Sequence, residues 1–280
     1  MVLLDTHVHI YDCFDLKVFF RSALANFRAV ASGISASEPF TAVLLLTDWA
    51  GQNWFEQLVE WVDKSAEGCL EGYGNWSWER TQEDSSLYLE DEAGNRVYIV
   101  AGRKIISSEN LEVLALTTGD SQFADGKCLR DSVETILEKG SVPLIPWAVG
   151  KWLGGRGKVL EQLIETVDPR SYFLCDNSNR PFFWTKPNHF LQFERKGGRI
   201  LSGSDPLHFP SEMKRAGSFG CWVEGTIDAD YPSVWLKALL RNQKVVFNLY
   251  GRLDTPIRFF RNQLAMQVLK KKWKSTYYRY

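Results

Sequence analysis

Six short, continuously apolar runs recur along the chain, each followed by a turn and then a helical pattern. Runs without alternation of polar and apolar residues are typical of parallel strands that helices cover on both faces. Repeated β–α units predict an α/β fold, and 280 residues can close such a sheet into one barrel domain spanning 1–280. The runs are VLLDTHVHI (2–10), FTAVLLLTDW (40–49), LEVLALTTG (111–119), VPLIPWAVG (142–150), YFLCDN (172–177) and RILSGSD (199–205).

Three of the intervening segments carry the apolar spacing of amphipathic helices. They are NWFEQLVEWVDKSAE (53–67), DSVETILEKG (131–140) and RGKVLEQLIETV (156–167). Residues 72–110 differ, because two β-rich runs flank the acidic, glycine-containing turn 90–95, which is a hairpin signal. We expect this hairpin to be an insertion or an antiparallel extension on the barrel.

The C-terminal segment, about 252–280, is strongly basic and aromatic, and Asp254 is its only acid. A helix is expected there from about 256 to 272. This helix either closes the fold with its cations in solvent or docks on an acidic partner or a nucleic-acid backbone. The net charge of -1 provides no global basic field, so nucleic acid is not expected to bind elsewhere on the chain.

The cysteines and the amino terminus indicate a soluble protein of the reducing cytoplasm. The five cysteines are widely spaced and form no CxxC pair, which is untypical of a disulfide framework or a zinc-thiolate site. The first residues lack the charged segment and cleavage site of a signal peptide, and no apolar stretch is long enough to cross a bilayer. No membrane association is therefore expected.

Two of the four histidines, His7 and His9, lie two residues apart at the end of the first apolar run. In a strand, residues i and i+2 point to the same side, so both imidazoles face one way, with Asp5 in the same row. Catalytic groups of α/β barrels gather at the carboxyl ends of strands. Two imidazoles and one or two carboxylates suit a divalent ion such as Zn, Mn or Fe. The other strand ends offer Asp48, Glu112, Asp176, Asp205 and His208.

Four motifs resemble, in order, those of the PHP (polymerase and histidinol phosphatase) superfamily. The resemblance implies a distorted seven-stranded (β/α)7 barrel, a cluster of up to three metal ions and hydrolysis of phosphoesters. The barrel would carry the hairpin as an insertion and the basic helix as a C-terminal extension. The motifs are DTHVHIYD (5–12), LLLTDWAG (44–51), AGRKIISSENLEVLALTT (101–118) and ILSGSDPLHFPSE (200–212).

The chain departs from the family pattern at several metal-ligand positions. Trp49 stands where the second motif has histidine, Lys104 where the third has a bridging glutamate, and Trp147 or Pro146 where the family has another histidine. One extra residue separates Asp205 from the histidine that follows it. The resemblance therefore implies one divalent ion, not a full cluster. Its expected ligands are His7, His9 and Asp205, helped by Glu112 or His208.

Basic and aromatic residues near the strand ends suggest how an anionic substrate is held. The segment 145–163 passes through glycines into a helix and carries Lys151 and Arg156, which with Lys104 would bind phosphate, sulfate or carboxylate groups. The alternative is a flexible loop with solvated cations. Three tryptophans at or just beyond strand ends belong to the core or wall a pocket. They are Trp49, Trp147 and Trp152.

Three functions are compatible with these residues. The first is a metal-dependent phosphoesterase acting on a small anionic substrate, in which Asp48 or Asp205 accepts a proton and Lys151 or Arg156 stabilises developing charge. The second is a catalytically degenerate barrel that binds a ligand or a partner. The third is an amidohydrolase-like hydrolase of C–N or C–O bonds, a family that also opens with His-x-His. That family needs histidines from two middle strands, where this chain offers only His189.

Overall fold

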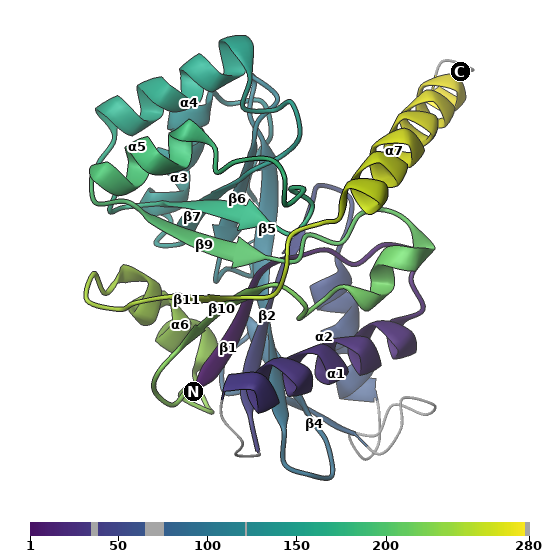
Figure 1. Cartoon of the computed structure of the whole chain (residues 1–280). Helices are drawn as coiled ribbons and strands as arrows, with labels where there is room; N and C mark the ends of the chain where they lie inside the picture. Colours follow the sequence, from purple (N-terminus) through teal and green to yellow (C-terminus); the bar gives the residue numbers. More distant parts are fainter. Residues whose placement is uncertain (35–38, 65–75, 121, 278–280) are drawn as a thin grey trace.

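The structure is a computed structural model that describes residues 1–34, 39–64, 76–120 and 122–277 (Figure 1). Its main sheet follows the strand order β11-β10-β1-β2-β5-β6-β7-β8-β9, with β4 paired to β5 and β3 paired to β4. The strands are β1 (Val2–Val8), β2 (Thr41–Asp48), β3 (Ser77–Arg80), β4 (Ser86–Glu90), β5 (Arg96–Ile106), β6 (Glu112–Leu116), β7 (Val142–Pro146), β8 (Phe173–Asn177), β9 (Arg199–Gly203), β10 (Gly220–Val223) and β11 (Asn248–Tyr250).

All six apolar runs form strands, namely β1, β2, β6, β7, β8 and β9. The three predicted helices are present as α2, α3 and α4, although 65–67 lie outside the described residues. The helices are α1 (Leu16–Ile34), α2 (Trp54–Lys64), α3 (Leu129–Glu138), α4 (Gly154–Thr166), α5 (Asn188–Arg195), α6 (Pro232–Arg241) and α7 (Pro256–Tyr277), with a 3₁₀ helix η1 (Pro210–Lys214).

The sheet curls so that β9 returns to β1 and the barrel is nearly closed. The closing contacts include the hydrogen bond from the Asp205 amide to the His7 carbonyl, at 2.8 Å, and the bond from Thr6 Oγ1 to the Ser202 carbonyl, at 3.0 Å. The carboxyl ends of β1 and β9, about two hundred residues apart in the sequence, therefore meet at one mouth of the barrel.

The strand directions differ from a regular (β/α)7 barrel. The pairs β1/β2, β2/β5, β7/β8 and β8/β9 are parallel, as expected. In contrast, β6 is antiparallel to both β5 and β7, and β10 is antiparallel to β1. The turn between β5 and β6 is too short for the crossover that a parallel pair requires, so β6 runs back along β5.

The predicted hairpin forms between β4 and β5, with Glu90 paired to Arg96, but the extension is smaller than 72–110. Only β3 and β4 extend the barrel, because β5 lies in the main sheet between β2 and β6. The reason is that β5 is apolar on both faces. Ile99 packs on the outer side toward the helices, whereas Val100 packs inside the barrel. Residues 72–75 lie outside the described residues.

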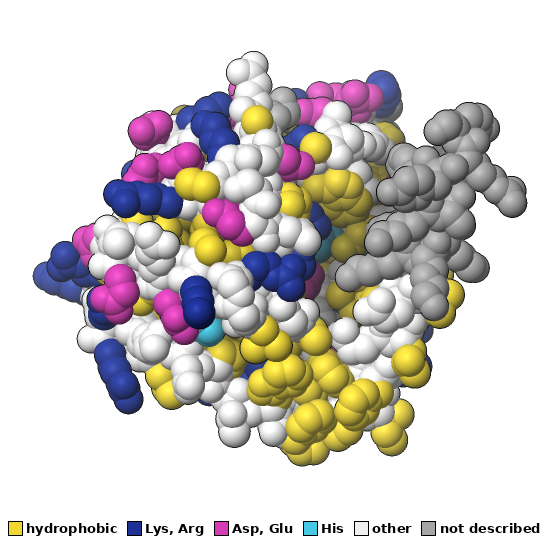
Figure 2. Space-filling view, turned by 90° about the horizontal axis from the view of Figure 1, so that it is seen from above, with side chains coloured by type: hydrophobic (Ala, Val, Ile, Leu, Met, Phe, Trp, Pro, Cys, Tyr) yellow, Lys and Arg dark blue, Asp and Glu magenta, His cyan; other side chains and the backbone are white. Residues whose placement is uncertain are grey.

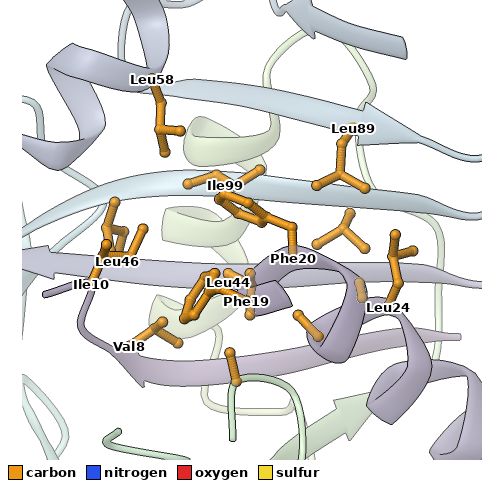
Figure 3. Close-up of a cluster of buried hydrophobic side chains, with 14 of the residues drawn as sticks. Val8, Ile10, Phe19, Phe20, Leu24, Leu44, Leu46, Leu58, Leu89 and Ile99 are labelled. Atoms are coloured by element: carbon orange, nitrogen blue, oxygen red, sulfur yellow. The ribbon is translucent and has the colours of Figure 1, made fainter. Parts of the chain in front are cut away.

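Separate apolar clusters fill the inside and the outside of the sheet. Figure 3 shows part of the outer cluster, where Phe19, Phe20 and Leu24 of α1 pack against β2 and β5. Each such buried side chain stabilises the fold by about 1.5–3 kcal/mol. Inside the barrel, Leu236 and Leu240 of α6 join the apolar residues of the strands. Apolar side chains thus fill the end of the barrel next to α6, and the polar groups of the interior lie at the opposite mouth.

The basic C-terminal segment is helical, as predicted, and α7 rises from the body of the molecule (Figure 1). Its base is fixed by two ion pairs at 2.8 Å, a buried one from Arg215 to Asp254 and one from the half-buried Arg258 to the buried Glu212. Phe259 is buried beside them. Among the residues that the structure describes, no helix combines the length and apolarity needed to span a membrane.

The close approach of β9 to β1 predicts that Gly203→Ala destabilises the protein. A Cβ at this position would lie 2.6 Å from the His7 Cβ and would also clash with the His7 backbone. We expect the free energy of unfolding in urea to fall by about 1–3 kcal/mol. Gly155→Ala in α4 is the matched control, because a Cβ there meets no atom within 4 Å. Equal stabilities of the two variants would contradict the close approach.

Candidate metal centre

An extra residue in β1 turns the two histidines toward the inside of the barrel. The register with β2 shifts between Asp5 and Val8, where β1 advances three residues while β2 advances two. Such a bulge reverses the alternation of side chains along a strand. Beyond it, Val8 packs outward with α1. His7 and His9, which flank Val8, therefore face the mouth of the barrel.

The prediction that Asp5 lies in one row with the histidines is wrong, because the bulge separates them. The Asp5 carboxylate instead accepts hydrogen bonds from the backbone amides of Ser204 and Gly217, both at 2.8 Å. These bonds tie β1 to the segment that follows β9. Complete burial raises the pKa of Asp5 to about 7, although the hydrogen bonds act in the opposite direction.

Three of the predicted metal ligands converge at the mouth. His7 Nε2 and His9 Nε2 lie 2.9 Å apart, and they lie 3.6 and 3.8 Å from Asp205 Oδ1. Within the described ranges, His7, His9 and Asp205 form the group of histidine, cysteine and acidic side chains whose ligand atoms are close enough to share an ion. The histidines are buried and Asp205 is half-buried.

The protein holds His9 in the form that binds metals. His9 Nδ1 lies 2.7 Å from the Thr47 carbonyl oxygen, and because a carbonyl only accepts, Nδ1 carries the proton. The lone pair of a neutral His9 is then on Nε2, which faces His7 and Asp205. Burial lowers the pKa of His9 well below its ordinary value and also lowers that of His7. Both imidazoles are therefore neutral near pH 7.

Two amides that the sequence analysis missed orient Asp205. Asn177 Nδ2 and Asn179 Nδ2 donate to Asp205 Oδ2, at 2.8 and 3.1 Å, which leaves Oδ1 toward the histidines. The Asp205 backbone adopts a left-handed φ of 45°, and its amide is bonded to His7. Burial raises the pKa of Asp205, and His7 opposes that shift. The polar stretch Asp-Asn-Ser-Asn at 176–179, where the apolar run 172–177 ends, was the signal in the sequence that could have identified these amides.

This donor set fits a divalent cation. Two neutral imidazole nitrogens and one carboxylate oxygen converge, and a carbonyl and two amides orient them from behind. Within the described residues, His7 Nδ1 is buried without a hydrogen-bond partner. The set is compatible with Zn, Mn or Fe.

A cleft of about 460 Å³ opens beside the three ligands, and His9 and Asp205 line it. Figure 2 looks down on this end of the molecule and shows a hollow with a histidine inside it, between basic and apolar side chains. The predicted residues that line the cleft, besides His9 and Asp205, are Trp49, Lys104, Glu112, Trp147, Lys151 and His208. The residues that the sequence analysis missed include Tyr11, Asn177, Asn179 and, from α7, Gln263, Met266 and Gln267.

His208 and Glu112, the two predicted additional ligands, line the cleft but do not belong to the converging group. The His208 ring stacks on Tyr11 at 4.4 Å between centroids. Glu112 and Lys104 face the cleft from the neighbouring strands β6 and β5. The Lys104 ammonium lies 4.9 Å from the centre of the Trp49 ring, a cation–π contact.

Asp48, predicted to be catalytic, lies outside the cleft. In β2 it alternates with Thr47, so it points to the outer side of the sheet, where Leu46 packs. Asp48 Oδ2 accepts a hydrogen bond from the Phe55 amide at 3.0 Å and so caps α2. Burial raises the pKa of Asp48 to about 6, although the bond from Phe55 and the charge of Arg103 lower it.

Arg156 and Trp152 also lie apart from the cleft lining. Arg156 donates to the Gly150 carbonyl at 2.9 Å and braces the loop that leads into α4. Trp152 is buried and packs against Phe190 of α5. The short glycine-containing loop turns both side chains toward the helices, so only Lys151 from this segment reaches the cleft as a cation.

No protein-family model matches the chain, and no curated protein matches its sequence. Its fold is similar to the crystal structure of PsfC from Pseudomonas syringae, with a TM-score of 0.56 and 14% identity over 95% of this chain and 98% of that one. The lesion-specific endonuclease PfuEndoQ from Pyrococcus furiosus has a TM-score of 0.49 and 10% identity, over 88% and 57% of the two chains.

A two-domain protein from Bacteroides vulgatus, described as containing a predicted PHP-like metal-dependent phosphoesterase, has a TM-score of 0.44 and 12% identity. The match covers 89% of this chain and 64% of that one. The likeness to PsfC extends over nearly the whole of both chains and shows a shared mixed α/β fold.

Asp48 makes the stability of the protein depend on pH. Its folded-state pKa of about 6 lies above the unfolded value near 3.9, so the folded state binds more protons between these values. The free energy of unfolding should therefore fall as pH rises from 4 to 7, by about 2–3 kcal/mol relative to Asp48→Asn. Urea unfolding of both proteins at several pH values measures this difference, and a constant difference would contradict the assignment.

The amides behind Asp205 predict a loss of metal affinity in Asn177→Ala. Without Asn177 the carboxylate is free to rotate away from the histidines, so we expect the affinity for Zn²⁺ or Mn²⁺ to fall by about 10–100-fold. Isothermal titration of metal-free protein measures this change. Asn95→Ala removes a buried amide that is bonded to Asp91, away from the cleft. If both variants bind metal like the wild type, Asn177 does not orient the ligand.

Proposed function

We propose that this protein is a metal-dependent hydrolase that binds one divalent ion through His7, His9 and Asp205 and acts on a small phosphate ester. The observation that carries the proposal is the convergence of these three ligand atoms beside an open cleft. The order of the four PHP-like motifs along the chain supports membership of that superfamily. The changed residues at positions 49, 104 and 147 support a single ion.

The residues of the cleft supply the other functions that such a reaction needs. A divalent ion, when bound, supplies Lewis acidity that polarises a phosphoryl oxygen and lowers the pKa of water. Lys151 Nζ is held by the backbone and side-chain oxygens of Asn110, at 2.7 and 2.8 Å. Together with Lys104 it offers two cations to an anionic substrate. Glu112 offers a carboxylate in the cleft that can accept a proton from water.

The positions of the other histidines argue against amidohydrolase chemistry. All four histidines of the chain are described, and His189 lies in α5 with its Nε2 3.3 Å from the Gly157 carbonyl oxygen. His208 stacks on Tyr11 in the wall of the cleft. No middle strand therefore contributes a histidine to the centre, as an amidohydrolase would require.

Protein purified without chelator is expected to contain about one Zn, Mn or Fe per chain and to hydrolyse phosphate esters such as 4-nitrophenyl phosphate or glycerol phosphate. The variant His7→Ala/His9→Ala should lose the metal and at least about 100-fold in rate, since a metal contributes several kcal/mol to the transition state. Elemental analysis and phosphate release measure both effects.

Asp48→Asn is the control for this experiment, because Asp48 caps α2 outside the cleft, and it should keep both metal and activity. If the wild type binds no metal and none of the three ions restores hydrolysis, the proposal is wrong. If the wild type hydrolyses no ester and His7→Ala/His9→Ala still binds the phosphate ester, the protein is a catalytically degenerate barrel that binds a ligand.

A further inference from the structure

A second pocket of about 260 Å³ lies beside the metal cleft, over the ends of β7 and β8. The loop from β7 to α4 forms one side, and the loop from β8 to α5 forms the other. Its lining residues are Trp147, Ala148, Gly150, Trp152, Leu153, Trp184, Thr185, Lys186, Pro187, Asn188 and His189.

Three tryptophans give this pocket flat, rigid walls. Trp147 and Trp152 are buried and Trp184 is half-buried. The rings of Trp147 and Trp184 meet edge to face, with 5.8 Å between centroids. The rings of Trp152 and His189 meet in the same way at 5.6 Å. Indole faces and edges of this kind favour an aromatic guest over an aliphatic one of equal size.

The pocket and the metal cleft share two lining residues. Trp147 and Ala148 line both the pocket and the cleft. The Trp147 carbonyl accepts a hydrogen bond of 2.6 Å from Asn177 Nδ2, the same amide that donates to Asp205. The shared wall and this hydrogen-bond chain place the pocket next to the proposed metal centre.

One polar group in the wall lacks a partner. The indole Nε1 of the buried Trp152 has no hydrogen-bond partner within the described part of the chain. A buried N–H without an acceptor is costly, and the Trp152 ring is held in place by its packing against Phe190 and His189. Lys186, in contrast, is engaged with Glu194 at 2.7 Å and lies exposed at the rim.

We propose that this pocket binds the flat aromatic group of the substrate, so that the enzyme prefers aryl or heteroaryl phosphate esters to alkyl esters. The inference rests on the proposed function, which places the phosphoryl group at the metal centre. The tryptophan walls hold the ring, the cleft holds the phosphate, and Trp147 sets the distance between them. Aliphatic esters fit the cleft but lose the ring contacts.

The test compares phenylphosphonate with cyclohexylphosphonate, which carry the same anionic group on rings of the same carbon count and cannot be hydrolysed at an ester bond. Isothermal titration of the metal-loaded protein should show phenylphosphonate binding about 5–10-fold more tightly, as expected for one or two aromatic contacts. Trp184→Leu should abolish the preference. Trp222→Leu, a half-buried tryptophan on β10, should keep it.

A second measurement does not depend on variants. The indole N–H signal of Trp152 in an NMR spectrum should shift with phenylphosphonate and not with cyclohexylphosphonate. Equal affinities, a preference that survives Trp184→Leu, or an unshifted Trp152 signal would overturn the inference.

The two proposals fail in different ways. A protein that prefers phenylphosphonate but hydrolyses no ester keeps the aromatic pocket and loses the proposed function. A protein that hydrolyses aryl and alkyl esters alike, without a binding preference, keeps the proposed function and loses the aromatic pocket.

Discussion

The closure between the ends of β1 and β9 is the contact on which the rest of the site depends. Gly203 has no side chain, so β9 can approach the His7 backbone closely, and the Asp205 amide can then bond to the His7 carbonyl. The Asp5 carboxylate secures the same junction through the Ser204 amide. This junction is what brings Asp205 close to His7 and His9.

Burying His7, His9 and Asp205 together costs folding free energy unless a cation or other polar groups compensate them. His7 and His9 are buried and neutral near pH 7, and the partners of the Asp205 carboxylate are amides and imidazoles. Removing charged and polar groups from water is unfavourable unless other charges or hydrogen bonds compensate. A bound divalent ion would compensate all three groups at once, which is a physical reason for the proposed metal and for the rigid support behind each ligand.

The cleft is assembled from distant parts of the chain, so charged, aromatic and uncharged side chains line it together. Lys104 and Glu112 face it from adjacent antiparallel strands, and the base of α7 closes one side with Met266 and its neighbours. The ion pair between Arg215 and Asp254 fixes that base. The basic segment thus contributes to the site through its uncharged residues. The role of its lysines in docking stays a prediction.

Local sequence was sufficient to predict the apolar strands, three helices, the His-x-His pair and the late aspartate, because strand and helix periodicity and strand ends are encoded by neighbouring residues. The direction in which these groups point was decided by tertiary structure. A single extra residue in β1 brings His7 inward, while Asp5, before the bulge, keeps the outward direction of Leu3. Alternation in β2 directs Asp48 to α2. Asn177 and Asn179 acquire their role only when β8 and β9 lie side by side. Register and long-range closure set these positions, and neither is expressed in the spacing of residues along the chain.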